Sequence, residues 1–424
     1  MSPRNSKQTA RSRKMGRSSE QKTEDSRLAW SRLLSSEFLA SSLASMLAYQ
    51  GFVMGWFVSS VLMTDRTNDS TLIALVYAAV QLPLLIVTLP AGVLASRFDR
   101  RRLLLATHSV TAMLLFFYST VSSRPELSPE LLIVLLFIVG VTAALAMALW
   151  QIAGPEIVDR SAVAPATTAI SGGFNVARLS GPLIAAICLQ WLGVRGTLLA
   201  SSGFVVLGVC LLLAVRWPLS VDARGTDTPA QSMRSPESCG YSGFSARRTC
   251  QILLLSACGS AVWALLPTLV QVRFPDDVAN SLGLLTSALG AGALLGACTA
   301  GVVHIRMALG SVIKISSVMM AILIIAIACP FPLWLLCTFS VGMGMFWFLC
   351  GTTLNIFVRT EAPVNLRAQR VARFLMTFYL GMAIGSFVWG ALAAQIGLGP
   401  TFFVAAICIF TASALQQQSD IQSA

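Results

Sequence analysis

Long apolar runs alternate with short polar gaps along almost the whole chain. A transmembrane helix needs about 20 mostly apolar residues, because each adds about 1.5 Å against a hydrocarbon core of about 30 Å. Twelve runs meet this test, near 38–63, 72–95, 103–121, 131–154, 167–190, 197–216, 250–271, 280–303, 309–329, 331–354, 371–395 and 398–415. The pattern predicts an all-α polytopic membrane protein with twelve transmembrane helices. The division of 309–354 into two runs rests on Pro330 and Pro332.

A polar stretch divides the twelve runs into two sets of six. Residues 217–249 are rich in Pro, Gly, Ser and charges and have no periodic segment. We therefore predict an N-terminal half over 37–216, a central loop over 217–249 and a C-terminal half over 250–415. A basic tail (1–36) and a short tail (416–424) flank them.

The two halves echo each other weakly in sequence. The run that begins at Gly92 and ends in Arg97 returns 209 residues later as Gly301 to Arg306. Repeated six-helix halves are a transporter plan, with the site at the interface between the repeats. The fold class predicted is two pseudo-symmetric six-helix halves.

Charge is scarce and unevenly distributed. Asp, Glu, Lys and Arg make up 11% of the 424 residues, against about 25% in soluble proteins, which excludes an ordinary soluble enzyme. Twenty-five of the 30 Lys and Arg fall in the gaps and tails on one side, and four fall on the other. The positive-inside rule then places both termini in the cytoplasm. The formal charge of +12 follows this topology and forms no stripe with interleaved aromatics, so no nucleic-acid partner is predicted.

The first 36 residues are rich in Ser, Lys, Arg and Gln and have no apolar periodicity. We predict a disordered cytosolic tail that is solvated or contacts anionic lipid heads. The apolar run that follows is too long for the core of a cleavable signal peptide.

The gap after the second run carries the sharpest motif. It reads Leu-Pro-Ala-Gly-Val-Leu-Ala-Ser-Arg-Phe-Asp-Arg-Arg-Arg over 89–102, and a related run spans Val358 to Val371 before the glycines of the eleventh run. These motifs resemble the major facilitator superfamily, and most closely its drug- and siderophore-exporting branch, which includes the bacterial enterobactin exporter. The resemblance covers about 37–415. It implies the major facilitator fold, alternating access and protons as the coupling ion.

The resemblance also implies a gate. Gly92 is expected to let helices approach closely, and arginines of the motif are expected to pair with acids at the end of the fourth run. The family usually has an acid where this chain has Ser96. The predicted gating residues are Gly92, Arg97, Asp99, Arg100, Arg101, Glu156 and Asp159.

The fifth run carries a charge near its middle. Arg178 is the one Lys or Arg near the centre of any run, at a cost of roughly 2.5–3.5 kcal/mol for insertion. Two interpretations stay open: Arg178 binds an anionic substrate, or it fastens its helix to backbone carbonyls. Gly181-Pro182 partly matches the family's antiporter motif, which favours export, and Gly381 and Gly385 fall opposite it in the second half. These four small or rigid residues are predicted to pack helices.

Further polar and aromatic residues near the centres of the runs are candidates to line a substrate cavity. With Arg178, the predicted set is Tyr49, Gln50, Gln81, Asn175, Trp263, Trp347 and Tyr379. Such a mixture suits a bulky, partly apolar ligand. Each residue alone is also compatible with ordinary helix packing.

No Asp or Glu lies in the middle of a run, so the proton carrier is not evident. Glu37 and Glu130 sit at the entrances of runs. Glu37, Glu156 or Asp99 at the cytoplasmic rim is a candidate carrier, and the alternative is that these are loop acids paired with arginines. The two histidines, at 108 and 304, are predicted to lie at the membrane interface. No HExxH motif, no paired mid-run Asp and no CxxC pair occurs, so we predict no enzyme, metal site or cofactor.

The predicted function is export of a small molecule across the inner membrane by a secondary transporter that works as a monomer. A siderophore or another anionic metabolite is the preferred cargo because of Arg178. Efflux of amphiphilic drugs is nearly as well supported, and import by the same fold comes third. A receptor or scaffold is disfavoured because every predicted outer loop is short.

Overall fold

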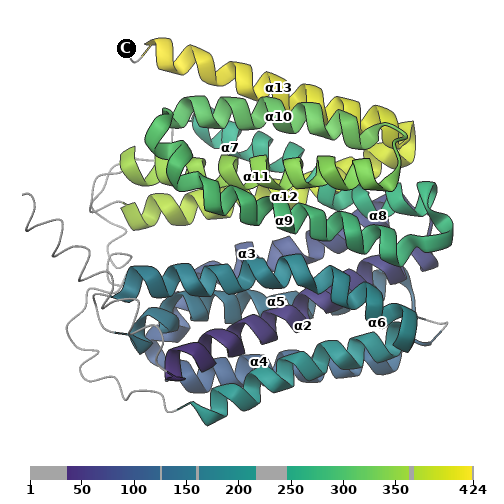
Figure 1. Cartoon of the computed structure of the whole chain (residues 1–424), viewed down its shortest axis with the longest axis vertical. Helices are drawn as coiled ribbons and strands as arrows, with labels where there is room; N and C mark the ends of the chain where they lie inside the picture. Colours follow the sequence, from purple (N-terminus) through teal and green to yellow (C-terminus); the bar gives the residue numbers. More distant parts are fainter. Residues whose placement is uncertain (1–35, 125–126, 159–161, 216–245, 362–366, 423–424) are drawn as a thin grey trace, which may run out of the picture.

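A computed structural model describes residues 36–124, 127–158, 162–215, 246–361 and 367–422, and these are helices joined by short turns (Figure 1). The α-helices are α2 (Ser36–Arg66), α3 (Ser70–Arg97), α4 (Arg100–Val121), α5 (Pro129–Ala153), α6 (Val163–Ala214), α7 (Ala246–Gly259), α8 (Ala261–Arg273), α9 (Val278–Arg306), α10 (Leu309–Ala328), α11 (Leu333–Glu361), α12 (Arg367–Ile396) and α13 (Leu398–Gln422).

The described helices make twelve passes through the bundle. Ten segments are long and apolar enough to cross a membrane, and Leu398–Ser413 is a shorter apolar helix. The 49-residue segment within α6 holds two passes, because Gly193 leaves the helical region with φ +64° and turns the chain back. α7 and α8 form a single pass, with a break at Ser260. The twelve predicted helices are confirmed, including the division between α10 and α11 at the two prolines.

Helices α2–α6 and α7–α13 form two bodies that lie side by side (Figure 1). We call the end of the bundle where α2 begins and α13 ends the terminal side, and the opposite end the far side. In Figure 1 the terminal side is on the left, and the two bodies stand farther apart there than on the right.

Arginines at equivalent places fasten the far side of each half. Arg66, at the end of α2, donates to the carbonyls of Ser122 and Arg124 after α4, at 3.2 and 3.1 Å. Arg273, at the end of α8, donates to the carbonyls of Ile327 and Cys329 at the end of α10, at 3.1 and 2.6 Å. In each half the first pass therefore caps the free carbonyls where the third pass ends.

Glycines allow the halves to approach each other. A Cβ on Gly290 of α9 would lie 2.8 Å from the Cα of Leu179 on α6, and one on Gly283 would lie 3.2 Å from the carbonyl oxygen of Pro182. Nearer the far side, a Cβ on Gly390 of α12 would lie 2.9 Å from the carbonyl oxygen of Ser70 on α3. Side chains at these three positions would separate the halves, because small residues are what let membrane helices approach backbone to backbone.

Gly381 and Gly385 lie against α7 within the second half. A Cβ on Gly385 would collide with the carbonyl of Ala257, and one on Gly381 would lie 2.7 Å from the carbonyl of Leu253. A Cβ on Gly92, in contrast, would meet no atom of the described residues within 4 Å. The close helix approach predicted at Gly92 is therefore absent from this conformation, in which the end of α3 stands open.

Gly385→Ala is expected to destabilise the protein by about 1–3 kcal/mol, because the methyl group must displace the backbone of α7. Thermal unfolding in detergent measures the loss. Gly92→Ala makes the same chemical change in open space and is the matched control. Equal unfolding temperatures for the two variants would contradict the packing described here.

Candidate functional site

Arg178 donates a hydrogen bond to a side-chain hydroxyl group. It lies near the middle of the first pass of α6, and its Nε donates to the hydroxyl oxygen of Tyr49 on α2 at 3.0 Å. Its guanidinium carbon lies 5.7 Å from the centre of the Tyr49 ring. The side chain is accessible, yet it interacts electrostatically with Tyr77 of α3 and Tyr379 of α12. These neighbours come from both halves, so the guanidinium lies close to the interface between them.

Beside Arg178, Gln50 ties α2 to α6. Its Oε1 accepts a hydrogen bond from Ser180 Oγ at 2.9 Å, while its buried Nε2 has no hydrogen-bond partner among the described residues. A Cβ on the neighbouring Gly181 would lie 3.1 Å from Val53 Cβ, and Pro182 is buried. Gln50, predicted to line a cavity, and Gly181-Pro182, predicted to pack helices, therefore lie at the same contact between α2 and α6.

An aromatic row crosses the interface between the halves. Trp56 and Tyr77 in the first half have ring centres 6.0 Å apart, and Tyr77 is stacked 6.5 Å from Trp263 of α8. The row continues to Trp347 of α11 at 4.9 Å and then to Phe378 of α12 at 5.5 Å. Trp263 and Trp347 were predicted from sequence, whereas Trp56, Tyr77 and Phe378 were missed.

Gln81 joins this row to the second half. Its Nε2 donates to the hydroxyl of Tyr77 at 2.8 Å and contacts Met382 Sδ at 3.5 Å across the interface. Tyr379 packs edge to face on Phe378, with ring centres 6.0 Å apart. Asn175 is half-buried one turn before Arg178. The predicted cavity residues therefore lie in two groups, a polar one on α2 and α6 and an aromatic one that spans the halves.

The indole of Trp347 packs against Gly259, in the space that a side chain at position 259 would fill. Gly259, at the end of α7, has the Trp347 ring where its own Cβ would stand. Because α7 ends there and α8 begins two residues later, the break in this pass provides room for the indole. Nothing in the sequence signals this contact, since the two residues are far apart along the chain.

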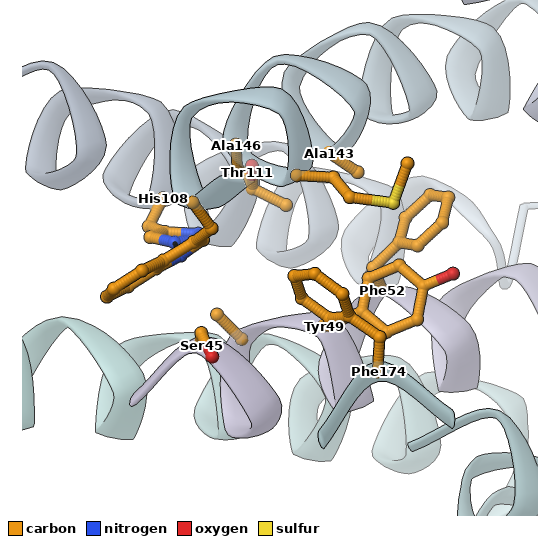
Figure 2. Close-up of a pocket in the computed structure, with 11 residues that line it drawn as sticks. Ser45, Tyr49, Phe52, His108, Thr111, Ala143, Ala146 and Phe174 are labelled. Atoms are coloured by element: carbon orange, nitrogen blue, oxygen red, sulfur yellow. Dashed lines mark hydrogen bonds between the residues drawn. The ribbon is translucent and has the colours of Figure 1, made fainter. Parts of the chain in front are cut away.

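A small pocket lies inside the first half, between α2, α4, α5 and α6 (Figure 2). Its free space of about 10 Å³ fits about one water molecule. Trp150 Nε1 donates to His108 Nε2 at 2.9 Å, and both side chains are buried. α4 begins at Arg100, so His108 lies more than two turns inside the helix and is buried in the protein, while its predicted place at the membrane interface stays a prediction. Tyr49 and Phe174 form the wall of the pocket towards Arg178.

The predicted gate is partly visible. Arg101 donates to the carbonyls of Leu212 and Leu213 at the end of α6, at 3.3 and 2.9 Å, so it caps a helix in this conformation. Asp99 accepts from the backbone N–H of Arg102 at 2.8 Å and caps α4. Arg97 is exposed at the end of α3, and Arg100 is half-buried. The side chain of Glu156 and all of Asp159 lie outside the described residues, so their predicted pairing with the arginines stays a prediction.

Comparison with known proteins assigns the family. The sequence profile described as transmembrane secretion effector matches residues 28–424, nearly the whole chain. The chain belongs to the transmembrane secretion effector family. Among curated protein sequences, none matches this chain significantly.

Solved transporters share the fold of this family member. A mutant of the nucleoside transporter NupG superposes with a TM-score of 0.71 at 16% identity, over 89% of this chain and 99% of NupG. A bacterial homolog of the human lysosomal transporter Spinster, inward-facing and occupied, gives 0.69 at 12% identity, over 90% and 96% of the two chains. A D-xylose–proton symporter gives 0.67 at 14% identity, over 89% and 96%. At these identities the likeness concerns the fold, which is that of major facilitator transporters.

The family and the fold together identify a multi-pass membrane transporter of the major facilitator superfamily. The resemblance of the sequence motifs to the major facilitator superfamily is therefore confirmed.

His108→Leu is expected to lower the free energy of unfolding by about 1–3 kcal/mol, because the buried Trp150 indole N–H loses its acceptor. His108→Gln offers a carbonyl oxygen in the same region and should lose less. Chemical or thermal unfolding compares the two variants. If both cost the same, the hydrogen bond contributes nothing and the shape of the ring decides.

Proposed function

We propose that this transporter exports a small anionic molecule, a siderophore or another anionic secondary metabolite, from the cytoplasm by alternating access. We further propose that it resides in a bacterial inner membrane with both termini inside, and that proton antiport drives it. With the terminal side in the cytoplasm, the conformation described here has its halves apart on the inside.

The proposal rests mainly on Arg178, a positive charge near the middle of a membrane helix that is exposed and donates a hydrogen bond through Nε. A charge in mid-membrane is costly unless it faces water or a partner. Here the hydrogen bond to Tyr49 engages Nε, and the Arg178 residue is exposed. A guanidinium presents five N–H donors in a planar fork and has no acceptor. Arg178 is thus suited to a carboxylate or another planar anion.

The cargo's second feature follows from the aromatic row. Trp263, Trp347 and Phe378 offer flat apolar surface from the second half, facing the half that supplies Arg178. A ligand that contacts both would carry an anionic group at one end and a ring or another bulky apolar group at the other. The description of the family as secretion effectors supports the outward direction.

A second candidate function is efflux of amphiphilic drugs. The aromatic row favours it, because aromatic surfaces accept many apolar shapes while Arg178 contributes little to a neutral or cationic drug. Import of a metabolite is the third candidate. The three functions differ in what accumulates and on which side of the membrane.

Arg178→Ala should reduce export of an anionic cargo by about ten- to a hundredfold, since a hydrogen bond to a charged group contributes about 1.5–3 kcal/mol. Efflux assays at equal protein abundance in the membrane measure the loss. Arg195→Ala, which removes an exposed arginine at the start of the second pass of α6, is the matched control. Unchanged export by the Arg178 variant would remove the substrate role of this residue.

The cargo itself can be found by mass spectrometry of culture supernatants and cell extracts, with and without the protein, in iron-poor and iron-rich medium. A siderophore retained in cells and missing outside is the expected result. Equal metabolite profiles combined with increased drug susceptibility of the deletion strain would favour the drug-efflux function. A metabolite depleted inside the deletion strain would indicate import.

A further inference from the structure

The side-chain amide of Gln271 crosses from the second half to the first at the far side. Gln271 lies in the last turn of α8, and its Nε2 donates to the carbonyl of Thr64 at 2.6 Å and to Asn68 Oδ1 at 2.9 Å. A longer contact of 3.3 Å reaches the carbonyl of Thr67. One NH₂ group has two hydrogens, so the two short bonds use its full donor capacity.

The acceptors of this amide are held in place by their own turn. The hydroxyl of Thr67 accepts from the backbone N–H of Asp69 at 3.0 Å, and the carboxylate of Asp69 accepts from the N–H of Thr71 at 2.7 Å. The turn between α2 and α3 therefore presents its oxygens in a fixed arrangement. Gln271 does not need to order a mobile loop, which would cost conformational entropy.

Each side of the contact is also fastened into its own half. Arg66, at the end of α2, binds carbonyls that follow α4, and Arg273, two residues after Gln271, binds carbonyls that end α10. When the amide bonds are made, the third pass of one half is linked to the third pass of the other through two arginines and one glutamine. The contact of Gln271 with the turn between α2 and α3 thus joins segments that are each attached to the rest of their own half.

The strength of the contact fits a bond that opens and closes. Neutral hydrogen bonds contribute roughly 0.5–1.5 kcal/mol net, because water replaces the partner when they break. Gln271 is half-buried and Asn68 lies beside exposed residues, so water can reach both. The other inter-half hydrogen bond described above, from Gln81, uses a thioether acceptor, which is weaker.

We propose that Gln271 is a positioning residue for transport, a latch that holds the far side closed while the terminal side is open. This inference rests on alternating access in the proposed function, but it does not depend on the cargo. Release of Thr64 and Asn68 would be required before the far side can open. Loss of the latch would shift the protein towards the conformation that is open on the far side.

Hydrogen–deuterium exchange of the full chain in lipid nanodiscs, without any ligand, tests the proposal. In Gln271→Ala, peptides covering 60–70 and 266–278 should exchange about tenfold faster, as the loss of two net hydrogen bonds implies. Peptides covering 90–99 and 369–376, on the terminal side, should exchange more slowly in the same sample. This reciprocal change is the signature of a shifted equilibrium between two open states.

Two further variants keep the test decisive. Gln271→Met preserves the length of the side chain without its donors and replaces the alanine variant if that one fails to fold. Gln190→Ala removes an exposed amide on the far side, three residues before the turn of α6 at Gly193, and should leave both sides unchanged. No change on the far side, or faster exchange on both sides together, would overturn the latch. A failed export assay with a preserved reciprocal change would instead refute the cargo and leave the latch standing.

Discussion

The architecture depends on contacts between helix backbones at the interface of the two halves. Gly283 and Gly290 of α9 admit α6, and Gly390 of α12 admits α3 towards the far side. In a membrane, such contacts gain van der Waals energy that lipid cannot supply, and any side chain at these positions would prevent them. The halves therefore meet through helix backbones there, while the two bodies stand farther apart on the terminal side (Figure 1).

Periodicity predicted the helices well because the bilayer fixes their length, and prolines divided α10 from α11. It did not indicate that His108 is buried in the protein, where it accepts a hydrogen bond from Trp150. It also misjudged Gly92. Whether a glycine meets a neighbouring backbone depends on where helices cross, and the sequence does not contain the crossing geometry.

The sequence indicated those site residues whose type is unusual in the middle of a membrane helix, and it did not indicate those whose type is frequent there. Arg178 stood out as a lone central charge, and its partner Tyr49 was among the candidates. The aromatic row was found only in part, because Trp56, Tyr77 and Phe378 look like any other aromatic residues of a membrane helix. They are recognised by ring contacts within each half that meet across the interface where Tyr77 stacks on Trp263. The contact of the Trp347 ring with Gly259 joins residues far apart in sequence, so no local sequence pattern reveals it.

The paired arginines at the far side bear on how the two halves can diverge after a duplication. Arg66 and Arg273 contact main-chain oxygens, which every residue type possesses. The residues that carry those oxygens, such as Ser122 and Cys329, are therefore free to change without loosening the attachment. Each half can drift in sequence at the end of its third pass while its frame stays the same. Two halves that share little sequence can then still move as matching rigid units.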